Sequence, residues 1–170
     1  MEQYYFAYGS NINLQQMALR CPNARVVGPC VLENYELLFR GNGGGFGVAT
    51  IAAKEGSRVH GLLWKITPRD EQRLDVYEGY PHLYEKQMVT VKAMHGEEVA
   101  VMAYVMTRET ERWPTVPAAS YYFGIMEGFQ RNGLPQEALK KALLQCWQEV
   151  DTLAPQRPQK KKKGRDTHER

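Results

Sequence analysis

The sequence lacks a long apolar run and a targeting segment. Its 170 residues contain no stretch near the roughly 18 apolar residues that a membrane-spanning helix needs. The first residues, Met1-Glu2-Gln3-Tyr4-Tyr5, lack the basic start and apolar core of a signal peptide. We therefore expect no membrane partner and a cytoplasmic location.

Cysteine and histidine are few and scattered. The three cysteines form no CxxC pair, and an odd number in a chain without an export signal argues against a disulfide framework. The four histidines show neither an HExxH motif nor paired His/Cys spacing. The cysteines are Cys21, Cys30 and Cys146, and the histidines are His60, His82, His95 and His168. We expect reduced thiols and no bound metal.

Charge is unevenly distributed in a composition that suits one globular core. The chain has 43% hydrophobic residues and a net charge of +3. Residues 156–170 hold seven basic and two acidic side chains, so the rest of the chain carries −2. The run Lys160–Lys163 has no apolar neighbours with which to bury surface. We expect one domain over 1–154 and a flexible basic tail over 155–170, which is either a solvated extension or a non-specific contact for nucleic acid.

The hydrophobic pattern indicates an α+β fold. Aromatic residues predict a strand over 3–7, strand character recurs over 25–32, 35–40, 47–52 and 59–66, and 83–94 with 98–106 reads as a hairpin. Helical spacing predicts helices over 14–21, 118–132 and 135–150, and the Thr-Pro-Arg-Asp start at 67–70 predicts a short helix that ends near residue 78. This order predicts one curved sheet or barrel, partly antiparallel, with helices packed outside it.

The segment Tyr8-Gly9-Ser10-Asn11 stands where the first strand gives way to a helix. A glycine there lets the backbone approach a ligand closely, and unpaired amides at the helix start favour an anion such as a carboxylate or phosphate. A plain capped turn is the alternative. Ser10 as a nucleophile is disfavoured, because the second glycine of a GxSxG elbow is missing.

The glycine-rich segment over 41–47 is a flexible loop by the same reasoning. Neither a Gly-Lys-Ser/Thr ending nor a GxGxxG frame is present, so a phosphate loop is disfavoured. A place near a substrate remains open for it.

Glu78 is the candidate acid/base. It stands among leucine, valine and tyrosine residues at the end of a predicted helix, where the helix dipole disfavours negative charge. A carboxyl group whose pKa is raised in this way can both take and give a proton. An ordinary surface glutamate is the alternative.

Together these segments resemble the γ-glutamylcyclotransferase family, including its AIG2-like branch, from about residue 4 to about residue 140. The matching residues are Tyr8-Gly9-Ser10-Asn11, Val59-His60-Gly61, Leu74-Asp75 with Glu78-Gly79, Tyr84, Tyr104, Pro117-Ala118-Ala119-Ser120-Tyr121 and Asn132-Gly133-Leu134-Pro135. The chain departs from the family at Ala118, where a serine is usual.

The resemblance implies a small, mainly antiparallel β-barrel with flanking helices and no cofactor. It implies a reaction in which the α-amine of a γ-glutamyl amino acid or γ-glutamylamine attacks its own γ-carbonyl, which yields 5-oxoproline and a released amine. Glu78 would be the catalytic acid/base. Tyr8, Gly9, Ser10, Asn11 and Tyr121 would bind the substrate.

Two classes of function follow from the resemblance: the enzyme, or a binding protein of the same fold that holds γ-glutamyl compounds or small carboxylates without turnover. Glu78 favours the enzyme, because a pocket that only binds a carboxylate gains nothing from a second negative charge beside it. We expect a small-molecule substrate, no specific nucleic-acid partner, and a possible homodimer.

Overall fold

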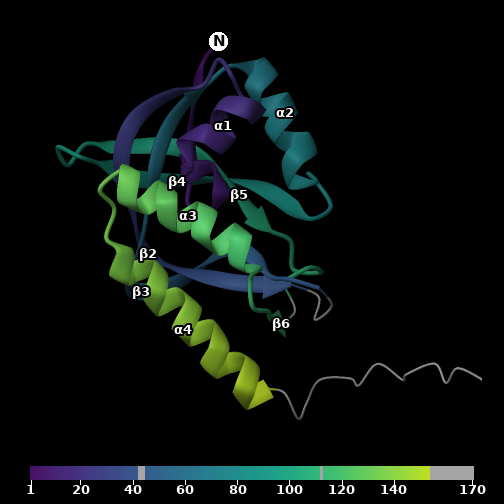
Figure 1. Ribbon diagram of the computed structural model, residues 1–170. Coiled ribbons are helices and arrows are strands. Elements are labelled where there is room, and N and C mark those ends of the chain that lie inside the picture. The colour runs from purple at the N-terminus through teal and green to yellow at the C-terminus, as the bar shows by residue number, and fades with distance from the viewer. Residues whose placement is uncertain (42–44, 112, 154–170) are drawn as a thin grey trace, which may run out of the picture.

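A barrel of strands forms the body of the protein, with helices on its outside (Figure 1). The computed structural model describes residues 1–41, 45–111 and 113–153, so the predicted tail over 155–170 lies outside the described residues. The strands are β1 (Gln3–Ala7), β2 (Arg25–Gly41), β3 (Val48–Ile66), β4 (Tyr84–Ala93), β5 (Glu98–Met106) and β6 (Trp113–Pro114). Within the described residues, five of them close in the order β3-β1-β5-β4-β2, because β2 pairs again with β3.

The strand pairings confirm the predicted α+β class and the mixed, mainly antiparallel barrel. β1 runs parallel to β5, and the other pairings between these strands are antiparallel. The predicted hairpin is present as β4 and β5, with Gly96 at a φ of 86° in the turn. β1 therefore lies inside the sheet, and its residues Phe6 and Ala7 are buried in the core.

The four predicted α-helices are present, although the last one runs three residues past its predicted end at residue 150, and a short 3-10 helix was not predicted. The helices are the 3-10 helix η1 (Ser10–Ile12), α1 (Leu14–Arg20), α2 (Pro68–Glu78), α3 (Ala119–Arg131) and α4 (Gln136–Leu153). At the start of α2, Thr67 and Asp70 exchange capping hydrogen bonds, and Gly79 ends the helix with a φ of 64°. Figure 1 shows α3 and α4 along one side of the barrel and α2 along another. None of the helices in the described ranges is long and apolar enough to cross a membrane.

Two long strands replace four of the predicted short ones. The segments 25–32 and 35–40 are one strand, β2, and the segments 47–52, apart from its first residue, and 59–66 belong to β3. β2 stays continuous because its register shifts at two irregularities, between Val26 and Gly28 and between Glu33 and Tyr35. Asn34, at the second, has a φ of 62°. The turn-forming residues that predicted loops here instead bend continuous strands.

A close contact between α3 and η1 fixes the turn that follows β1. A Cβ atom on Gly128 would lie 2.8 Å from the carbonyl carbon of Ile12 and 2.9 Å from the amide nitrogen of Asn13. Asn132 donates to the carbonyl of Ile12 at 3.1 Å, and Asn13 donates to the carbonyl of Gly124 at 2.9 Å. Backbone therefore packs directly on backbone where α3 crosses η1.

Replacing Gly128 with alanine tests this contact, and Gly124→Ala is the matched control on the same helix. We expect Gly128→Ala to lower the free energy of unfolding by ~1–3 kcal/mol, because rigid backbone atoms must move. A Cβ on Gly124 would meet only the amide end of Gln16, which can move aside, so the better helix propensity of alanine leaves Gly124→Ala neutral or up to ~1 kcal/mol more stable. Urea unfolding measures both variants, and equal effects would refute the contact.

Candidate active site

The turn after β1 presents Ser10 and Asn11 to a cavity. Asn13 caps α1 by accepting the amide of Gln16 at 3.1 Å, so neither Ser10 nor Asn11 is used as the cap of that helix. The indole of Trp64 donates to the backbone carbonyl of Asn11 at 3.1 Å and holds the turn against β3. The turn is therefore more than a capped helix start, because its polar side chains contact other elements and line a cavity.

A cavity of about 180 Å³ brings the predicted site residues together. It lies between the turn, the end of α2 and the start of α3. The predicted residues that line it are Tyr8, Gly9, Ser10, Asn11, Glu78 and Tyr121. Glycine at position 9 leaves space in the cavity, because a Cβ atom there would lie 3.3 Å from the Cβ atom of Ala49 and 3.5 Å from the Tyr121 hydroxyl.

Glu78 is the last residue of α2, and its carboxyl group reaches the cavity. Burial raises the pKa of this carboxyl to about 7, and the nearby positive charge of Arg20 acts in the opposite direction. The Asn11 side-chain nitrogen lies 3.4 Å from Glu78 Oε1. A carboxyl group with a pKa near neutrality exchanges a proton readily in both directions.

Hydrogen bonds and ion pairs fasten α2 to the barrel one turn before Glu78. Tyr104 on β5 donates its hydroxyl to Asp75 at 2.6 Å, and Lys86 on β4 lies 2.9 Å from the same carboxylate. Lys86 also pairs with Glu71 at 2.8 Å. These contacts fix the position of α2 against β4 and β5, and with it the position of Glu78 at the cavity.

Six tyrosines make the cavity wall aromatic and polar at once: Tyr5, Tyr8, Tyr77, Tyr84, Tyr104 and Tyr121. Tyr8 donates to the carbonyl of Tyr104, and Tyr84 donates to that of Ala49 at 2.6 Å. Tyr121, by contrast, accepts the amide of Ala49 at 2.9 Å, and its hydroxyl proton has no acceptor among the residues that the structure describes. That proton is available to a ligand.

Charge in the cavity is limited to one group. Of the described residues that line it, Glu78 alone carries an ionisable carboxyl, and no lysine, arginine or histidine side chain joins it there. A bound anion would therefore be met by backbone amides and hydroxyl groups. Within the described ranges, no group of three or more metal-ligating side chains occurs.

Sequence reasoning missed Arg20, Tyr5 and Tyr77 as parts of the site. Arg20 donates to Asn11 Oδ1 at 2.6 Å, Tyr5 accepts from the Asn11 amide at 3.0 Å, and Tyr77 contacts Ser10 at 3.1 Å. Two features of the sequence could have indicated such residues: a basic residue at the end of the helix that follows the turn, and a tyrosine next to Glu78. The glycine-rich loop over 41–47 lies partly outside the described residues, and Val48, which follows it, lines the cavity.

Comparison with known proteins identifies the family. Residues 5–123 match the family described as gamma-glutamyl cyclotransferase, AIG2-like. The chain is similar to gamma-glutamylcyclotransferase of Bos taurus, with 34% identity over 81% of this chain and 75% of the relative, and to that of Homo sapiens, with the same identity and shares. A solved structure of a gamma-glutamyl cyclotransferase superposes with a TM-score of 0.74 at 31% identity, over 84% of this chain and 86% of that one.

The chain belongs to the gamma-glutamyl cyclotransferase, AIG2-like family. The predicted family is thereby confirmed, and so is the predicted class of protein, an enzyme of the cyclotransferase type.

The raised pKa of Glu78 makes the stability of the protein depend on pH in a known direction. Below about pH 4.5 the group is protonated in both states, and between about 4.5 and 7 the unfolded chain loses the proton first, so the native state becomes less stable as the pH rises. We expect wild type to lose ~2–3 kcal/mol relative to Glu78→Gln between about pH 4 and pH 8.

Urea unfolding of both proteins at the two pH values measures this difference, and other titrating groups cancel between them. A difference that stays constant with pH would mean that the Glu78 pKa is ordinary.

Proposed function

We propose that Glu78 is the acid/base of a γ-glutamyl cyclisation that releases 5-oxoproline in this cavity. The observation that carries the proposal is the position of Glu78: a carboxyl group with a pKa of about 7, in the cavity that the Tyr8–Asn11 turn also lines, with Oε1 3.4 Å from the Asn11 side-chain nitrogen. The names of the relatives, gamma-glutamylcyclotransferase, support the same substrate class.

The reaction needs few groups, because the nucleophile and the electrophile belong to one molecule. Glu78 takes a proton from the α-ammonium of the substrate, and the freed amine attacks the γ-carbonyl to form the five-membered ring. Glu78 delivers this proton to the leaving nitrogen as its C–N bond breaks. The ring nitrogen must lose a second proton to become the lactam N–H, and the same carboxyl takes that proton and passes it to the released amine. The products are 5-oxoproline and the free amine or amino acid, and no cofactor takes part.

Substrate binding falls to the turn and to Tyr121. Backbone amides of Gly9, Ser10 and Asn11 receive the α-carboxylate, because the described lining of the cavity offers no cation for it. The Tyr121 hydroxyl donates to the γ-carbonyl oxygen, on which negative charge develops during attack. The ring of Tyr8, whose hydroxyl is bound to Tyr104, forms part of the wall.

The Glu78→Gln variant tests the proposal, because it keeps the shape of the side chain and removes the base. We expect wild type to form 5-oxoproline from at least one member of a panel of γ-glutamyl dipeptides and γ-glutamylamines, and Glu78→Gln to be slower by ~10²–10⁴-fold. Mass spectrometry follows the product.

The matched control is Glu85→Gln, which makes the same change at an exposed position on β4 and should keep wild-type activity. Glu78→Gln activity within a few fold of wild type would contradict the assigned role. Absence of turnover by wild type on the whole panel would contradict the substrate class.

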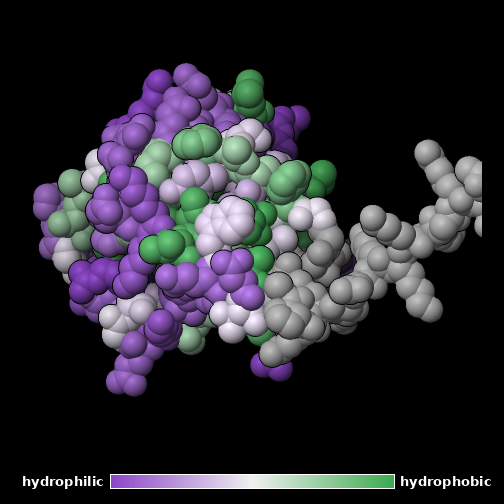
Figure 2. Space-filling view, turned by 60° about the horizontal axis from the view of Figure 1, so that its bottom comes forward, coloured by the Kyte–Doolittle hydropathy of each residue, from purple (hydrophilic) through white to green (hydrophobic). Residues whose placement is uncertain are grey.

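The partners beyond the substrate stay predictions. Figure 2 shows apolar side chains gathered in the middle of one face, with polar side chains around them. Large apolar side chains are also exposed on the two C-terminal helices, namely Phe123 on α3 and Leu144 and Trp147 on α4. A homodimer, the lack of a specific nucleic-acid partner and the cytoplasmic location remain expectations from the sequence.

A further inference from the structure

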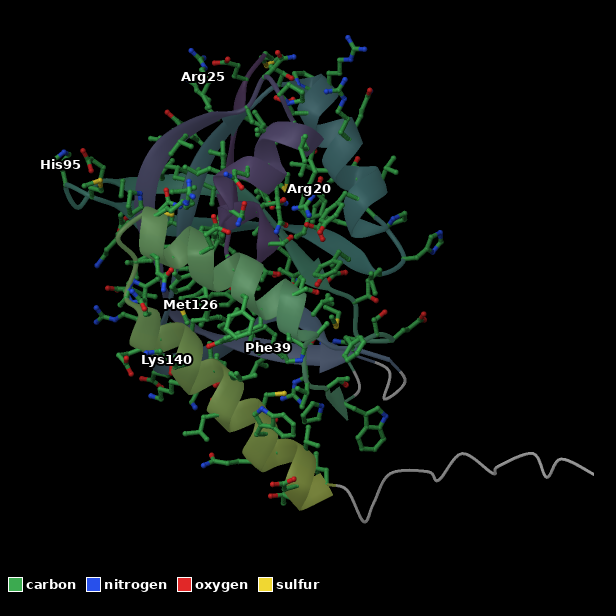
Figure 3. All side chains as sticks on the ribbon, in the orientation of Figure 1. Arg20, Arg25, Phe39, His95, Met126 and Lys140 are labelled. Carbon is green, nitrogen blue, oxygen red and sulfur yellow. The ribbon has the colours of Figure 1, made fainter. Side chains whose placement is uncertain are left out.

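Arg20 lies at the end of α1, and its side chain extends toward α2 (Figure 3). Its Nη1 atom donates to Asn11 Oδ1 at 2.6 Å and to Ser10 Oγ at 3.1 Å, and its Nη2 atom donates to Gln16 Oε1 at 2.9 Å. The guanidinium also lies over the ring of Tyr77, 3.7 Å from its centroid. The planar fork is therefore held in place from several sides.

Neutral groups supply all of these contacts. Within the described ranges Arg20 forms no salt bridge, although it lies close enough to Glu78 to influence its ionisation. An arginine on a helix end usually meets solvent or a carboxylate. Here its shortest hydrogen bond goes to a side-chain amide oxygen in the cavity wall.

That hydrogen bond decides which way the Asn11 amide points. A guanidinium has only hydrogen-bond donors. It therefore binds the amide oxygen of Asn11, which is an acceptor, and disfavours the amide nitrogen, which is a donor. With Oδ1 bound to Arg20, the Nδ2 atom must face the opposite side, where it lies 3.0 Å from the Tyr5 hydroxyl and 3.4 Å from Glu78 Oε1. Rotation of the amide would break the contacts with Arg20 and Glu78, whereas the Tyr5 hydroxyl could still donate to the amide oxygen.

We propose that Arg20 is a positioning residue, which locks the Asn11 amide so that its N–H faces the Glu78 carboxyl in the cavity. The inference rests on the proposed function of Glu78. Arg20 affects Glu78 in two ways. Its guanidinium orients the Asn11 amide that faces Glu78, and its positive charge favours the ionised form of Glu78, which burial disfavours.

Other groups around Glu78 do not substitute for this charge. They are the hydroxyls of Tyr5 on β1, Tyr8 in the turn after β1, Tyr77 on α2, Tyr84 on β4 and Tyr121 on α3. A tyrosine hydroxyl cannot supply a positive charge, so Arg20 is the one positive charge among the described groups that influence Glu78.

The first experiment measures the titration midpoint of Glu78 in Arg20→Met by NMR of ¹³C-labelled carboxyl groups. Loss of the charge should raise the midpoint by about one pH unit, and Arg20→Lys, which keeps the charge, should restore most of it. The control is Arg25→Met, the same substitution at an exposed arginine that pairs with Glu2. An unchanged midpoint in Arg20→Met would overturn the influence of Arg20.

A double-mutant cycle tests the orientation of Asn11. It is run at about pH 9, where Glu78 is ionised in every variant and only geometry differs. Arg20→Met and Asn11→Ala should each lower kcat/KM by about tenfold, and the double variant should be no slower than the slower single variant. Effects that multiply would show that the two residues act independently and would overturn the proposal.

The two readouts separate this inference from the proposed function. If wild type turns over no γ-glutamyl compound, the cyclotransfer proposal fails, whereas the NMR midpoints still decide whether Arg20 acts on Glu78. If Arg20→Met does not fold, Arg20→Ala supplies the cycle, because alanine also lacks a hydrogen-bond donor and is a strong helix former.

Discussion

The close packing of Gly128 against the backbone of η1 is the contact on which the site depends. It lets α3 press on Ile12 and Asn13, so that the turn after β1 is held between a helix and the barrel. Trp64 holds the same turn from the barrel side through the carbonyl of Asn11. The turn keeps one conformation because backbone groups on both sides are hydrogen-bonded, and the side chains of Ser10 and Asn11 are left for the cavity.

Opposing electrostatic effects then set the chemistry of Glu78. Removal of water from the carboxyl disfavours its charge, while the Arg20 guanidinium favours it, and burial is the larger effect. A direct ion pair would have cancelled that rise. Arg20 is instead held by the ring of Tyr77 and by neutral acceptors, so its charge moderates the pKa without abolishing the rise. A single carboxyl can thus serve as base and then as acid.

Local sequence signals were sufficient to predict most helices and strands. The features that they did not predict depend on contacts between residues far apart in the sequence. The end of α2 at Glu78 and the turn at Gly9 follow from capping and turn residues within a few positions, so both were predicted. The continuity of β2 was missed because Asn34 looks like a loop signal, whereas strand pairing with β3 holds it in a bend. The proposed role of Arg20 was missed because its influence on Glu78, 58 positions away, arises only where the fold brings α1 and α2 together.

The central claim is that burial tunes Glu78 to titrate near neutrality in the free protein, and a direct measurement of this pKa tests it. NMR of ¹³C-labelled glutamate carboxyl groups, with the Glu78 signal assigned by its loss in Glu78→Gln, follows the ionisation without any substrate. The account predicts a midpoint of about 7. A midpoint near the ordinary glutamate value of about 4.3 would contradict it, because Glu78 would then be fully ionised at neutral pH and a poor proton donor to the leaving group.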